Sequence, residues 1–477
     1  MSAGRGRLSF AGWCFVLSLV AAASLIDACG AGPGAGLRPN VLLVLVDDLN
    51  CDIACYGAQN VKTPHIDALA GRGVRFANAY AQATACNPSR ASLLTGRNPT
   101  ATRVLDNRTS YREALPAAVT LARHFRNHGY VTAAAGKIAH RGFDDREAWA
   151  RHGKFRLLSR DRSESPRARR ARRRQADRWA ASGPGPGEGQ RDYQVADHAI
   201  RLLNQIGKEP FFLAVGFDTT HPPLVSPRSY HDLYERQEVE LPADFSVLPR
   251  GDRPAFRENT GLFQARRGSP EAARSATKAY WAATSFVDAQ LGRLLEELDH
   301  LALRESTVVV FASDHGFHLG EKGLWGKSTL FERGLRVPLV IAGPGIAADT
   351  ACTRPVQLVD LYPTLVDLAN LPQPGPLDGR SLKPLLVEPG SVWPHAARSW
   401  LQRGDVFGAT LRTEHHRYTE WDEGAAGREL YDHRSDSDEA RNLADDPSQA
   451  AVVARLSAAL RAAAGEREMA EPVPGGG

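Results

Sequence analysis

Short apolar runs alternate along the chain with longer stretches in which apolar residues recur every three or four positions. The short runs are rich in β-branched or aromatic residues, as expected of strands buried on both faces of a parallel sheet. They lie at residues 40–46, 130–135, 211–217, 307–312 and 338–341. The periodic stretches predict helices at residues 63–73, 119–128 and 279–303. Because the two patterns alternate over roughly 300 residues, we predict an α/β fold with a large, mostly parallel sheet sandwiched by helices.

The pattern changes near residue 385, where the segments become shorter and more polar. Antiparallel strands are predicted at residues 400–405, 409–413 and 416–421, followed by Glu-Leu-Tyr-Asp-His at 429–433 and a helix at 449–464. The closing Pro-Val-Pro-Gly-Gly-Gly predicts a frayed tail. We therefore divide the chain into a large domain, residues 38–384, and a smaller C-terminal α+β subdomain, residues 385–477.

The first 29 residues have the pattern of a signal peptide, with Arg5 and Arg7 before an apolar run. The Ile-Asp-Ala-Cys stretch ending at Cys29 resembles a bacterial lipoprotein cleavage box, and ordinary cleavage nearby remains an alternative. Residues 30–37 would then form a flexible tether. We expect an exported protein of the bacterial periplasm or cell surface, with a lipid on Cys29 as its only attachment to a membrane.

Positive charge is concentrated in one segment of the chain. Residues 151–178 contain twelve Lys or Arg against three Asp or Glu, whereas the whole chain has a net charge of only +5. The segment could bind a polyanion, but the Pro- and Gly-rich residues after it favour a solvated loop insertion at 156–190. Since no nucleic-acid motif accompanies the charge, we expect no nucleic-acid partner.

Six cysteines occur in the sequence, and two of them, Cys14 and Cys29, belong to the export segment. Cys51 and Cys55 are close enough in sequence for a disulfide or a metal pair, but no second pair or nearby histidines complete a zinc set. The chain is therefore not a disulfide scaffold, and Cys86 has to be explained by its neighbours.

Polar pairs follow two of the predicted buried strands. Asp47-Asp48 comes directly after the strand at 40–46, and Asp314-His315 follows the strand at 307–312. In open α/β sheets the carboxyl ends of the strands are where ligands bind. Three carboxylates and an imidazole make an oxygen-rich site, which favours calcium or magnesium over zinc. Two Asp after a single strand are more often a turn or a cap, so the second pair carries this prediction.

Cys86 lies at the start of C-N-P-S-R-A-S-L-L-T-G. Pro88 predicts a turn, and the Ser-Leu-Leu-Thr-Gly after it predicts the beginning of a helix. A nucleophile at a helix N-terminus faces free backbone N–H groups and the positive end of the helix dipole, a setting suited to an anionic substrate.

This segment resembles the signature of the sulfatase family, Cys-x-Pro-Ser-Arg followed by Leu-Thr-Gly, in which the cysteine is converted to formylglycine. The similarity continues in order through N-V-L-L-V-L-V-D-D-L from residue 40, T-P-H-I-D-A-L-A from 63, G-K-I-A-H from 136, F-F-L-A-V-G-F from 211 and S-D-H-G-F-H-L-G-E-K-G-L-W-G-K from 313. It is greatest to the iduronate-2-sulfatase branch and its bacterial relatives. The resemblance implies an alkaline-phosphatase-like fold and maturation by a formylglycine-generating enzyme.

The resemblance also implies roles for individual residues. The metal ligands would be Asp47, Asp48, Cys86 in its modified form, Asp314 and His315, with calcium as the ion and magnesium as the alternative. Arg90 would hold the formylglycine, Lys137 and His140 would flank it, and Lys327 would grip the sulfate. His221 would face the leaving oxygen as the acid, and His140 would be the base that lets sulfate depart. Alone, each Lys or His of this set is more easily read as a surface charge or a core histidine.

The function implied is hydrolysis of a sulfate ester, either on a sulfated glycan such as a 2-O-sulfated uronate or on a small molecule. Residues 217–220 depart from the lysosomal iduronate enzyme's more basic segment, so choline- and aryl-sulfatase-like specificities stay open. Two further alternatives are a phosphonate or phosphodiester hydrolase of the same superfamily and an inactive glycan-binding surface protein.

Overall fold

The computed structural model describes residues 38–140, 142–150, 179–245, 255 and 269–465. The predicted signal peptide, the tether, most of the basic insertion and the predicted frayed tail lie outside these residues. Every described helix and strand belongs to one compact unit, Pro39–Gly477. None of the helices in the described part is both long and apolar enough to cross a membrane.

A seven-stranded sheet forms the centre of this unit, and its strand order is β13-β2-β12-β8-β1-β6-β4. The strands are β1 (Asn40–Val46), β2 (Gly73–Phe76), β4 (Val131–Gly136), β6 (Phe211–Phe217), β8 (Thr307–Ser313), β12 (Leu339–Ala342) and β13 (Thr350–Cys352). All neighbouring pairs are parallel except those of β12, which runs antiparallel to both β8 and β2. The predicted α/β fold with a mostly parallel sheet is confirmed.

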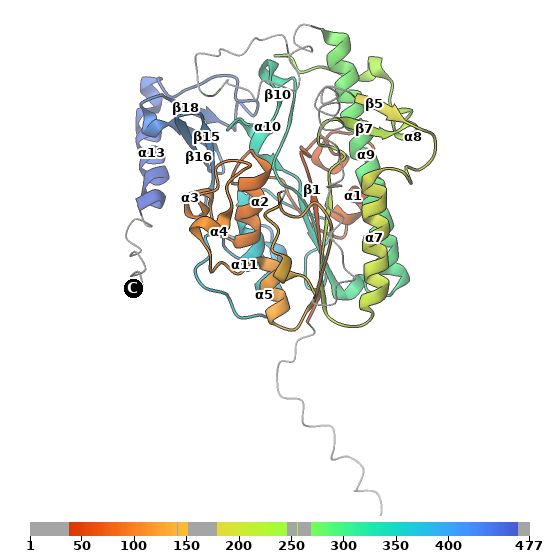
Figure 1. Ribbon diagram of the computed structural model, residues 1–477. Coiled ribbons are helices and arrows are strands. Elements are labelled where there is room, and N and C mark those ends of the chain that lie inside the picture. The colour runs from red at the N-terminus through yellow and green to blue at the C-terminus, as the bar shows by residue number, and fades with distance from the viewer. Residues whose placement is uncertain (1–37, 141, 151–178, 246–254, 256–268, 466–477) are drawn as a thin grey trace, which may run out of the picture. The chain divides into compact units, whose positions relative to one another are not determined.

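Helices cover both faces of this sheet (Figure 1). One face carries α2 (Cys86–Thr95), α5 (Leu121–Asn127) and α11 (Leu361–Leu368), and the other carries α1 (Pro64–Ala70), α7 (Arg191–Ile206) and α9 (Pro270–His300). In β1, Val41, Leu43 and Leu45 contact the first group of helices, while the alternate residues contact the second. Successive side chains of a strand point to opposite faces, so a strand buried on both sides is apolar throughout.

Two helices begin earlier than the sequence pattern indicates. The α9 helix starts at Pro270 rather than near residue 279, because the Ser269 hydroxyl accepts a hydrogen bond from the Ala272 N–H and caps the helix. The α2 helix starts at Cys86 itself, so Pro88 lies in its first turn instead of in a turn before it. Proline is tolerated there because the first N–H groups of a helix have no intrahelical acceptor.

The C-terminal segments form a separate four-stranded antiparallel sheet and a helix, as the sequence predicts. The elements are β15 (Ala397–Arg403), β16 (Val406–Arg412), β17 (His416–Trp421), β18 (Gly427–Asp432) and α13 (Ala450–Gly465). Strand β15 lies beside the segment before α2, because the Trp400 N–H donates to the Gln82 carbonyl and the Ser399 hydroxyl to the Ala81 carbonyl. The domain boundary after residue 384 stays a prediction.

The remaining elements are short. The helices are α3 (Pro99–Thr102), α4 (Tyr111–Ala114), α8 (Arg228–His231), α10 (Glu332–Leu335) and α12 (Lys383–Val387). The strands are β3 (Ala79–Tyr80), β5 (Trp179–Ser182), β7 (Leu224–Pro227), β9 (His318–Leu319), β10 (Trp325–Gly326), β11 (Arg336–Val337) and β14 (Val356–Gln357). Strand β5 lies within the predicted loop insertion and pairs in parallel with β7, a long-range contact that the local sequence does not reveal.

Candidate active site

The two polar pairs predicted from the sequence meet at one edge of the sheet. Strands β1 and β8 are parallel neighbours, and their last residues, Val46 and Ser313, are paired. The backbone N–H of Asp314 donates to the Val46 carbonyl at 3.1 Å, and the N–H of Asp48 donates to Asp314 Oδ1 at 3.1 Å. Asp48 adopts a φ of 61°, a left-handed conformation that L residues other than Asn and Asp rarely take. The register of the sheet therefore brings the Asp47-Asp48 and Asp314-His315 pairs together.

Cys86 is the first residue of α2 and is buried against these carboxylates. Its Sγ lies 3.4 Å from Asp47 Oδ1 and accepts a hydrogen bond from Lys327 Nζ at 3.1 Å. The Ser89 hydroxyl, one turn further along α2, donates to the Asp314 backbone carbonyl. The start of α2 is thus fastened to the end of β8, which fixes where the Cys86 side chain points.

The surroundings of Cys86 favour its anionic form. Burial and the Asp47 carboxylate raise the pKa of this thiol. Lys137, Lys327 and a hydrogen bond with His140 lower it, and their combined effect is larger, so the pKa lies well below its usual value. The site is therefore built to hold negative charge at the position of Cys86 Sγ.

Arg90 contacts both aspartate pairs of this site and the backbone after β4. It is buried, with its side chain 1% exposed, and its Nε donates to Asp314 Oδ2 at 2.9 Å. One terminal nitrogen lies 3.5 Å from Asp47 Oδ1, and the other donates to the backbone carbonyls of Lys137 and Ile138 at 2.7 and 3.0 Å. A planar guanidinium can reach these acceptors at once, which a lysine could not.

Two lysines bring positive charge to the same point from different elements. Lys137 follows β4 and forms an ion pair with Asp47, and Lys327 follows β10 and forms one with Asp48. Lys327 Nζ also lies 3.3 Å from His315 Nε2. Burial lowers the pKa of each ammonium, but the carboxylates and Cys86 outweigh this and raise it above its usual value. Both side chains are therefore cationic at neutral pH.

The three predicted histidines lie around this charged centre. A nitrogen of His221 lies within 4.8 Å of ligand atoms of Asp47, Asp48 and Cys86. His221 Nδ1 lies 2.7 Å from the Pro222 carbonyl, so this nitrogen carries the proton and Nε2 is left for chemistry. His315 is held in the same way by the Gly316 carbonyl at 3.1 Å. The structure thus brings every site residue predicted from the sequence into one cluster.

The donor set fits a divalent cation. Asp47, Cys86, Asp314 and His315 offer ligand atoms that all lie within 4.8 Å of one another, and Asp48 belongs to an overlapping group. Asp48 Oδ2 is buried without a hydrogen-bond partner, which is costly for a carboxylate oxygen unless a cation contacts it. Carboxylate oxygens suit a hard ion such as calcium or magnesium.

Several supporting residues had no signal in the sequence pattern. The Thr220 hydroxyl donates to the Asp47 carbonyl at 2.6 Å, and the backbone N–H of Asn87 donates to Asn107 Oδ1 at 3.0 Å. On the other side of the site, His318 Nε2 lies 2.8 Å from the Thr329 hydroxyl, next to the segment that carries Lys327. These contacts join residues far apart in the chain, so only the tertiary structure shows them.

His318 is neutral in the folded protein. Its side chain is buried, and the guanidinium of Arg333 and the ammonium of Lys322 add nearby positive charge. Burial first, and these charges with that of Arg403, lower the pKa of His318 to about 3. The same Arg403, from the C-terminal sheet, donates to the Ser328 carbonyl. The loop after Lys327 is therefore held both by His318 of β9 and by Arg403 of the C-terminal sheet.

The other described cysteines differ from Cys86. Cys51, Cys55 and Cys352 are free thiols, so the disulfide considered for Cys51 and Cys55 is not formed in this structure. Burial above all raises the pKa of Cys51 to about 11 and that of Cys55 to about 12. Among the described cysteines, Cys86 alone has a lowered thiol pKa.

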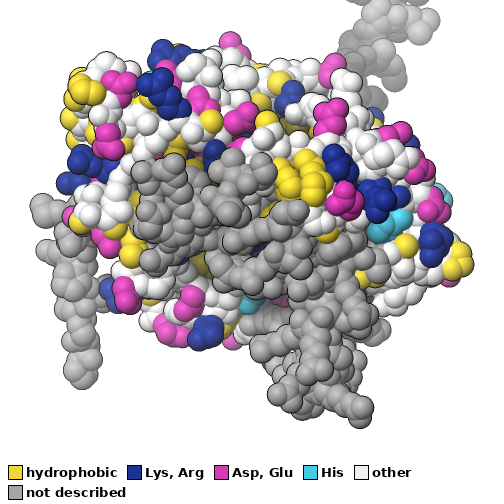
Figure 2. Space-filling view, turned by 90° about the horizontal axis from the view of Figure 1, so that it is seen from above, with side chains coloured by type: hydrophobic (Ala, Val, Ile, Leu, Met, Phe, Trp, Pro, Cys, Tyr) yellow, Lys and Arg dark blue, Asp and Glu magenta, His cyan; other side chains and the backbone are white. Residues whose placement is uncertain are grey.

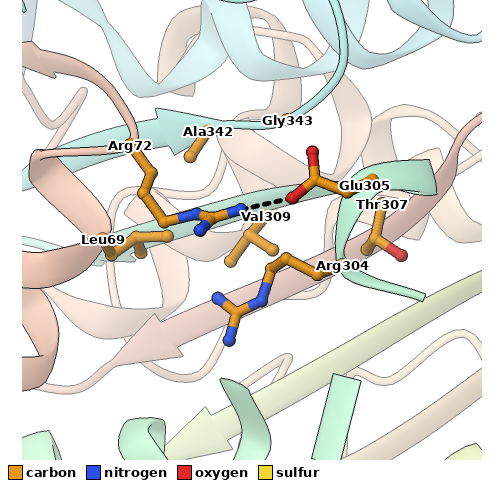
Figure 3. A pocket seen from close by; sticks show the side chains of 8 residues that line it. All are labelled: Leu69, Arg72, Arg304, Glu305, Thr307, Val309, Ala342 and Gly343. Carbon is orange, nitrogen blue, oxygen red and sulfur yellow. Dashed lines mark hydrogen bonds and ion pairs between the residues drawn. The ribbon is translucent and has the colours of Figure 1, made fainter. Parts of the chain in front are cut away.

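Figure 2 looks onto the molecule from above the carboxyl end of β1, and the acidic and basic side chains visible on its described residues are interspersed. A pocket at the opposite end of β8 is shown in Figure 3, where the exposed Arg72–Glu305 ion pair lies beside Thr307. Because Thr307 starts β8 and Asp314 follows its end, this pocket is separate from the active site.

Comparison with known proteins agrees with this geometry. The sulfatase family model matches residues 39–371, which includes every residue of the site. The chain belongs to the sulfatase family. A second family model, for the C-terminal part of N-sulphoglucosamine sulphohydrolase, matches residues 320–466 of this sulfatase. The family predicted from the signature is confirmed, and with it the enzyme class, a sulfuric ester hydrolase.

Individual relatives of this sulfatase have different names. Choline-sulfatase of Rhizobium meliloti is 35% identical over 372 residues, 73% of this chain and 72% of that protein. Human iduronate 2-sulfatase is 33% identical over 393 residues, 70% of each chain. Among solved structures, phosphonate monoester hydrolase of Agrobacterium radiobacter has a TM-score of 0.74 at 26% identity, over 90% of this chain and 96% of that one. A 2-O GAG sulfatase has a TM-score of 0.72 at 25% identity, over 91% and 93%.

Proposed function

We propose that this sulfatase removes sulfate from a sulfated glycan, with formylglycine derived from Cys86 as the nucleophile and a divalent cation beside it. The observation that carries the proposal is the position of Cys86 Sγ, 3.4 Å from Asp47 Oδ1 and 3.1 Å from Lys327 Nζ inside a buried cluster of carboxylates. In the matured enzyme an oxygen of formylglycine would stand where this sulfur stands. A nucleophile placed between cation ligands and an ammonium suits an anionic ester.

The proposed cation is calcium, with magnesium as the alternative. Asp47, Asp48, Asp314 and His315 would hold it together with the formylglycine oxygen. When bound, the ion supplies Lewis-acid polarisation of the sulfate and offsets the charge that grows in the transition state.

The chain's own cations do the rest of the charge neutralisation. Lys327 Nζ is within hydrogen-bond distance of Cys86 Sγ and is the group best placed to grip the sulfate. Lys137 lies near the same position, because it forms an ion pair with Asp47, the carboxylate next to Cys86. Fixed cations in a buried site stabilise a developing negative charge far better than water does, because they need not reorganise during the reaction.

Two histidines would move the protons. His221 donates Nδ1–H to the Pro222 carbonyl, so its Nε2 is the atom that can hold a proton and give it to the leaving alcohol oxygen. His140, which makes a hydrogen bond with Cys86, would be the base that takes the proton of the second, non-attacking hydroxyl and so lets sulfate depart. Hydrated formylglycine offers two hydroxyls on one carbon. One can attack sulfur, and loss of the other's proton expels sulfate and restores the aldehyde, a route closed to an unmodified serine or cysteine.

For the substrate we propose a sulfated glycan, in particular a 2-O-sulfated uronate. The identity to human iduronate 2-sulfatase and the structural similarity to a 2-O GAG sulfatase support this choice. A choline-sulfatase-like specificity is the second candidate, because the Rhizobium meliloti choline-sulfatase is 35% identical. A phosphonate or phosphodiester substrate is the third, on the structural similarity to the Agrobacterium radiobacter hydrolase. Substrate contacts come from variable loops, so the shared centre does not choose among them.

The nucleophile is tested first. Mass spectrometry of the proteolytic peptide that contains Cys86, from protein co-expressed with a formylglycine-generating enzyme, should show the aldehyde form. Cys86→Ala should abolish sulfatase activity, while Cys352→Ala, a change at another buried cysteine, should retain it. Full activity of Cys86→Ala would refute the proposed nucleophile.

The substrate is tested by a desulfation screen on defined sulfated disaccharides, with and without a chelator. Release of sulfate from the 2-position of a uronate, lost on chelation and restored by calcium, is the expected result. Turnover of choline sulfate or small aryl sulfates alone would favour the second candidate, and faster turnover of aryl phosphate esters would favour the third.

We also propose that the enzyme is exported, as its first 29 residues indicate. Maturation would then require a formylglycine-generating enzyme that acts on the unfolded chain, because Cys86 is buried in the folded one. Radiolabelled fatty acid incorporated into the wild-type protein but not into Cys29→Ser would establish the lipid anchor, and an unlabelled wild-type protein would exclude it.

A further inference from the structure

Asp192 is a fully buried carboxylate to which the proposed chemistry assigns no role. It lies in the first turn of α7 and is 0% exposed. Its oxygens do not cap α7. They accept hydrogen bonds from the backbone N–H groups of Asp218, at 2.9 and 3.1 Å, and of Thr219, at 2.8 Å. The Thr219 hydroxyl adds another at 2.7 Å. A buried carboxyl group is retained only where such partners compensate its desolvation.

The loop that Asp192 holds carries two parts of the active site. The Asp218 carbonyl accepts the backbone N–H of His221 at 3.1 Å, which closes a turn and places the proposed acid. Thr220, the residue directly before His221, donates its hydroxyl to the Asp47 carbonyl. The loop is also tied to the start of α7 by an ion pair of 2.7 Å between Arg191 and the Asp218 carboxylate.

We propose that Asp192 is a positioning residue that fixes the 218–221 loop so that His221 can protonate the leaving oxygen. The inference rests on the proposed role of His221 as the acid. Loops at the carboxyl ends of strands have few packing contacts of their own, so their geometry depends on such hydrogen bonds. Asp192 connects this loop to α7, which is packed against the sheet and against α9.

The substitution Asp192→Asn tests this role with little change in volume. An amide keeps one acceptor oxygen, which can replace the carboxylate oxygen that accepts from both Asp218 and Thr219. Its NH₂ group then stands where the other oxygen accepts from the Asp218 N–H at 3.1 Å, and an NH₂ group cannot accept. The loop must then shift to relieve the clash of donors. A misplacement of about 1 Å in a reacting group costs on the order of 10²-fold in rate.

The leaving group of the substrate separates positioning from general support. An alkyl sulfate releases a basic alkoxide that needs the proton from His221, whereas 4-nitrophenyl sulfate releases a stable phenolate that does not. We expect Asp192→Asn to lower kcat/KM for an alkyl or glycan sulfate by about 10²-fold. For 4-nitrophenyl sulfate we expect a loss of less than about threefold. If Asp192→Asn instead loosened the whole site, through the contact of Thr220 with Asp47, kcat/KM would fall by the same factor for both esters.

Three further variants complete the experiment. Asp197→Asn removes another carboxylate of α7, one that pairs with Arg293 away from the loop, and should change neither rate. Thr219→Ala removes one hydrogen bond to Asp192 and should lower kcat/KM for the alkyl or glycan sulfate by a smaller factor. Thr219→Ser, which keeps the hydroxyl, should have the wild-type kcat/KM. These milder changes keep the test available if Asp192→Asn does not fold.

His221→Ala gives the reference pattern and tells the two hypotheses apart. It should show the same dependence on leaving group as Asp192→Asn, with a larger loss, and the double variant should be no worse than His221→Ala alone. If His221→Ala shows the dependence and Asp192→Asn and Thr219→Ala do not, the positioning role of Asp192 is wrong and the acid role stands. If His221→Ala itself slows both esters equally, the acid role and the inference on Asp192 both fail.

Discussion

Arg90 offers a direct test of how this site is held together. Its guanidinium contacts two carboxylates and two backbone carbonyls, and the side chain is 1% exposed. The substitution Arg90→Met keeps an unbranched apolar side chain in place of the arginine stem and removes the guanidinium with its charge. Asp47 and Asp314 then lie 1% exposed beside each other without the cation between them.

The cost should be large because an uncompensated buried charge remains. Removing one partner of a buried ion pair destabilises a protein by about 3–5 kcal/mol. The surface pair of Arg72 with Glu305, whose side chains are 55% and 87% exposed, provides the control. Arg72→Met should cost less than about 1 kcal/mol, because exposed charges keep their hydration. Arg90→Lys keeps the charge but loses the fork of donors, so its cost should lie between these two.

Urea unfolding followed by tryptophan fluorescence measures these differences. The experiment is done in a chelator, because an ion that binds only the folded protein would add its own stabilisation. Wild type and all variants are compared at the same protein concentration. An unfolding free energy of Arg90→Met within 1 kcal/mol of that of Arg72→Met would refute the reasoning, since it would mean that the buried carboxylates do not need the guanidinium.

Three other results follow from the site. Lys327→Ala should lower kcat/KM by on the order of 10²-fold or more, while Lys62→Ala, at an exposed lysine that donates to a backbone carbonyl, should leave it unchanged in the same assay. Free calcium at 100 times its dissociation constant, added to the metal-free protein, should raise the free energy of unfolding in urea by about 2.7 kcal/mol. No stabilisation would contradict a cation site. The pKa of His318 is about 3 in the fold and about 6.5 when unfolded. Above about pH 6.5 both states are neutral at His318, so the free energy of unfolding has its full value there. It falls by about 1.4 kcal/mol per pH unit as the pH drops toward 3, so His318→Gln should flatten the pH dependence of the unfolding free energy in that range, and an unchanged slope would contradict this reasoning.

The sequence alone determined the main elements and the chemistry they carry. The strand at residues 40–46 is apolar at every position after Asn40 because both faces of the sheet are covered, and this pattern is readable without coordinates. The acids after it, and the Asp314-His315 pair after β8, could be assigned to one site because parallel strands end at the same edge. The signature at Cys86 predicted the family, which the comparisons confirm.

Where the local pattern fell short, a distant contact was the reason. The α2 helix begins at Cys86 although Pro88 suggested a turn, and its first turn is fastened to the Asp314 carbonyl by Ser89. Strand β5 lies in a stretch that the charge and glycine pattern assigned to a loop, because its partner β7 is about forty residues away in the chain.

The tertiary structure alone decided which side chains support the site. Asp192 and Thr219 have no special spacing in the sequence, yet a hydrogen bond of 2.7 Å joins them under the loop of His221. Arg403 reaches the loop after Lys327 from a sheet whose sequence shows no catalytic motif. Periodicity reports which face of an element is buried, since that is a local property. The partner that meets a buried polar group is set by how distant elements pack, and this is why the sequence could name the candidate reacting groups but not the contacts of Asp192, Thr219 and Arg403.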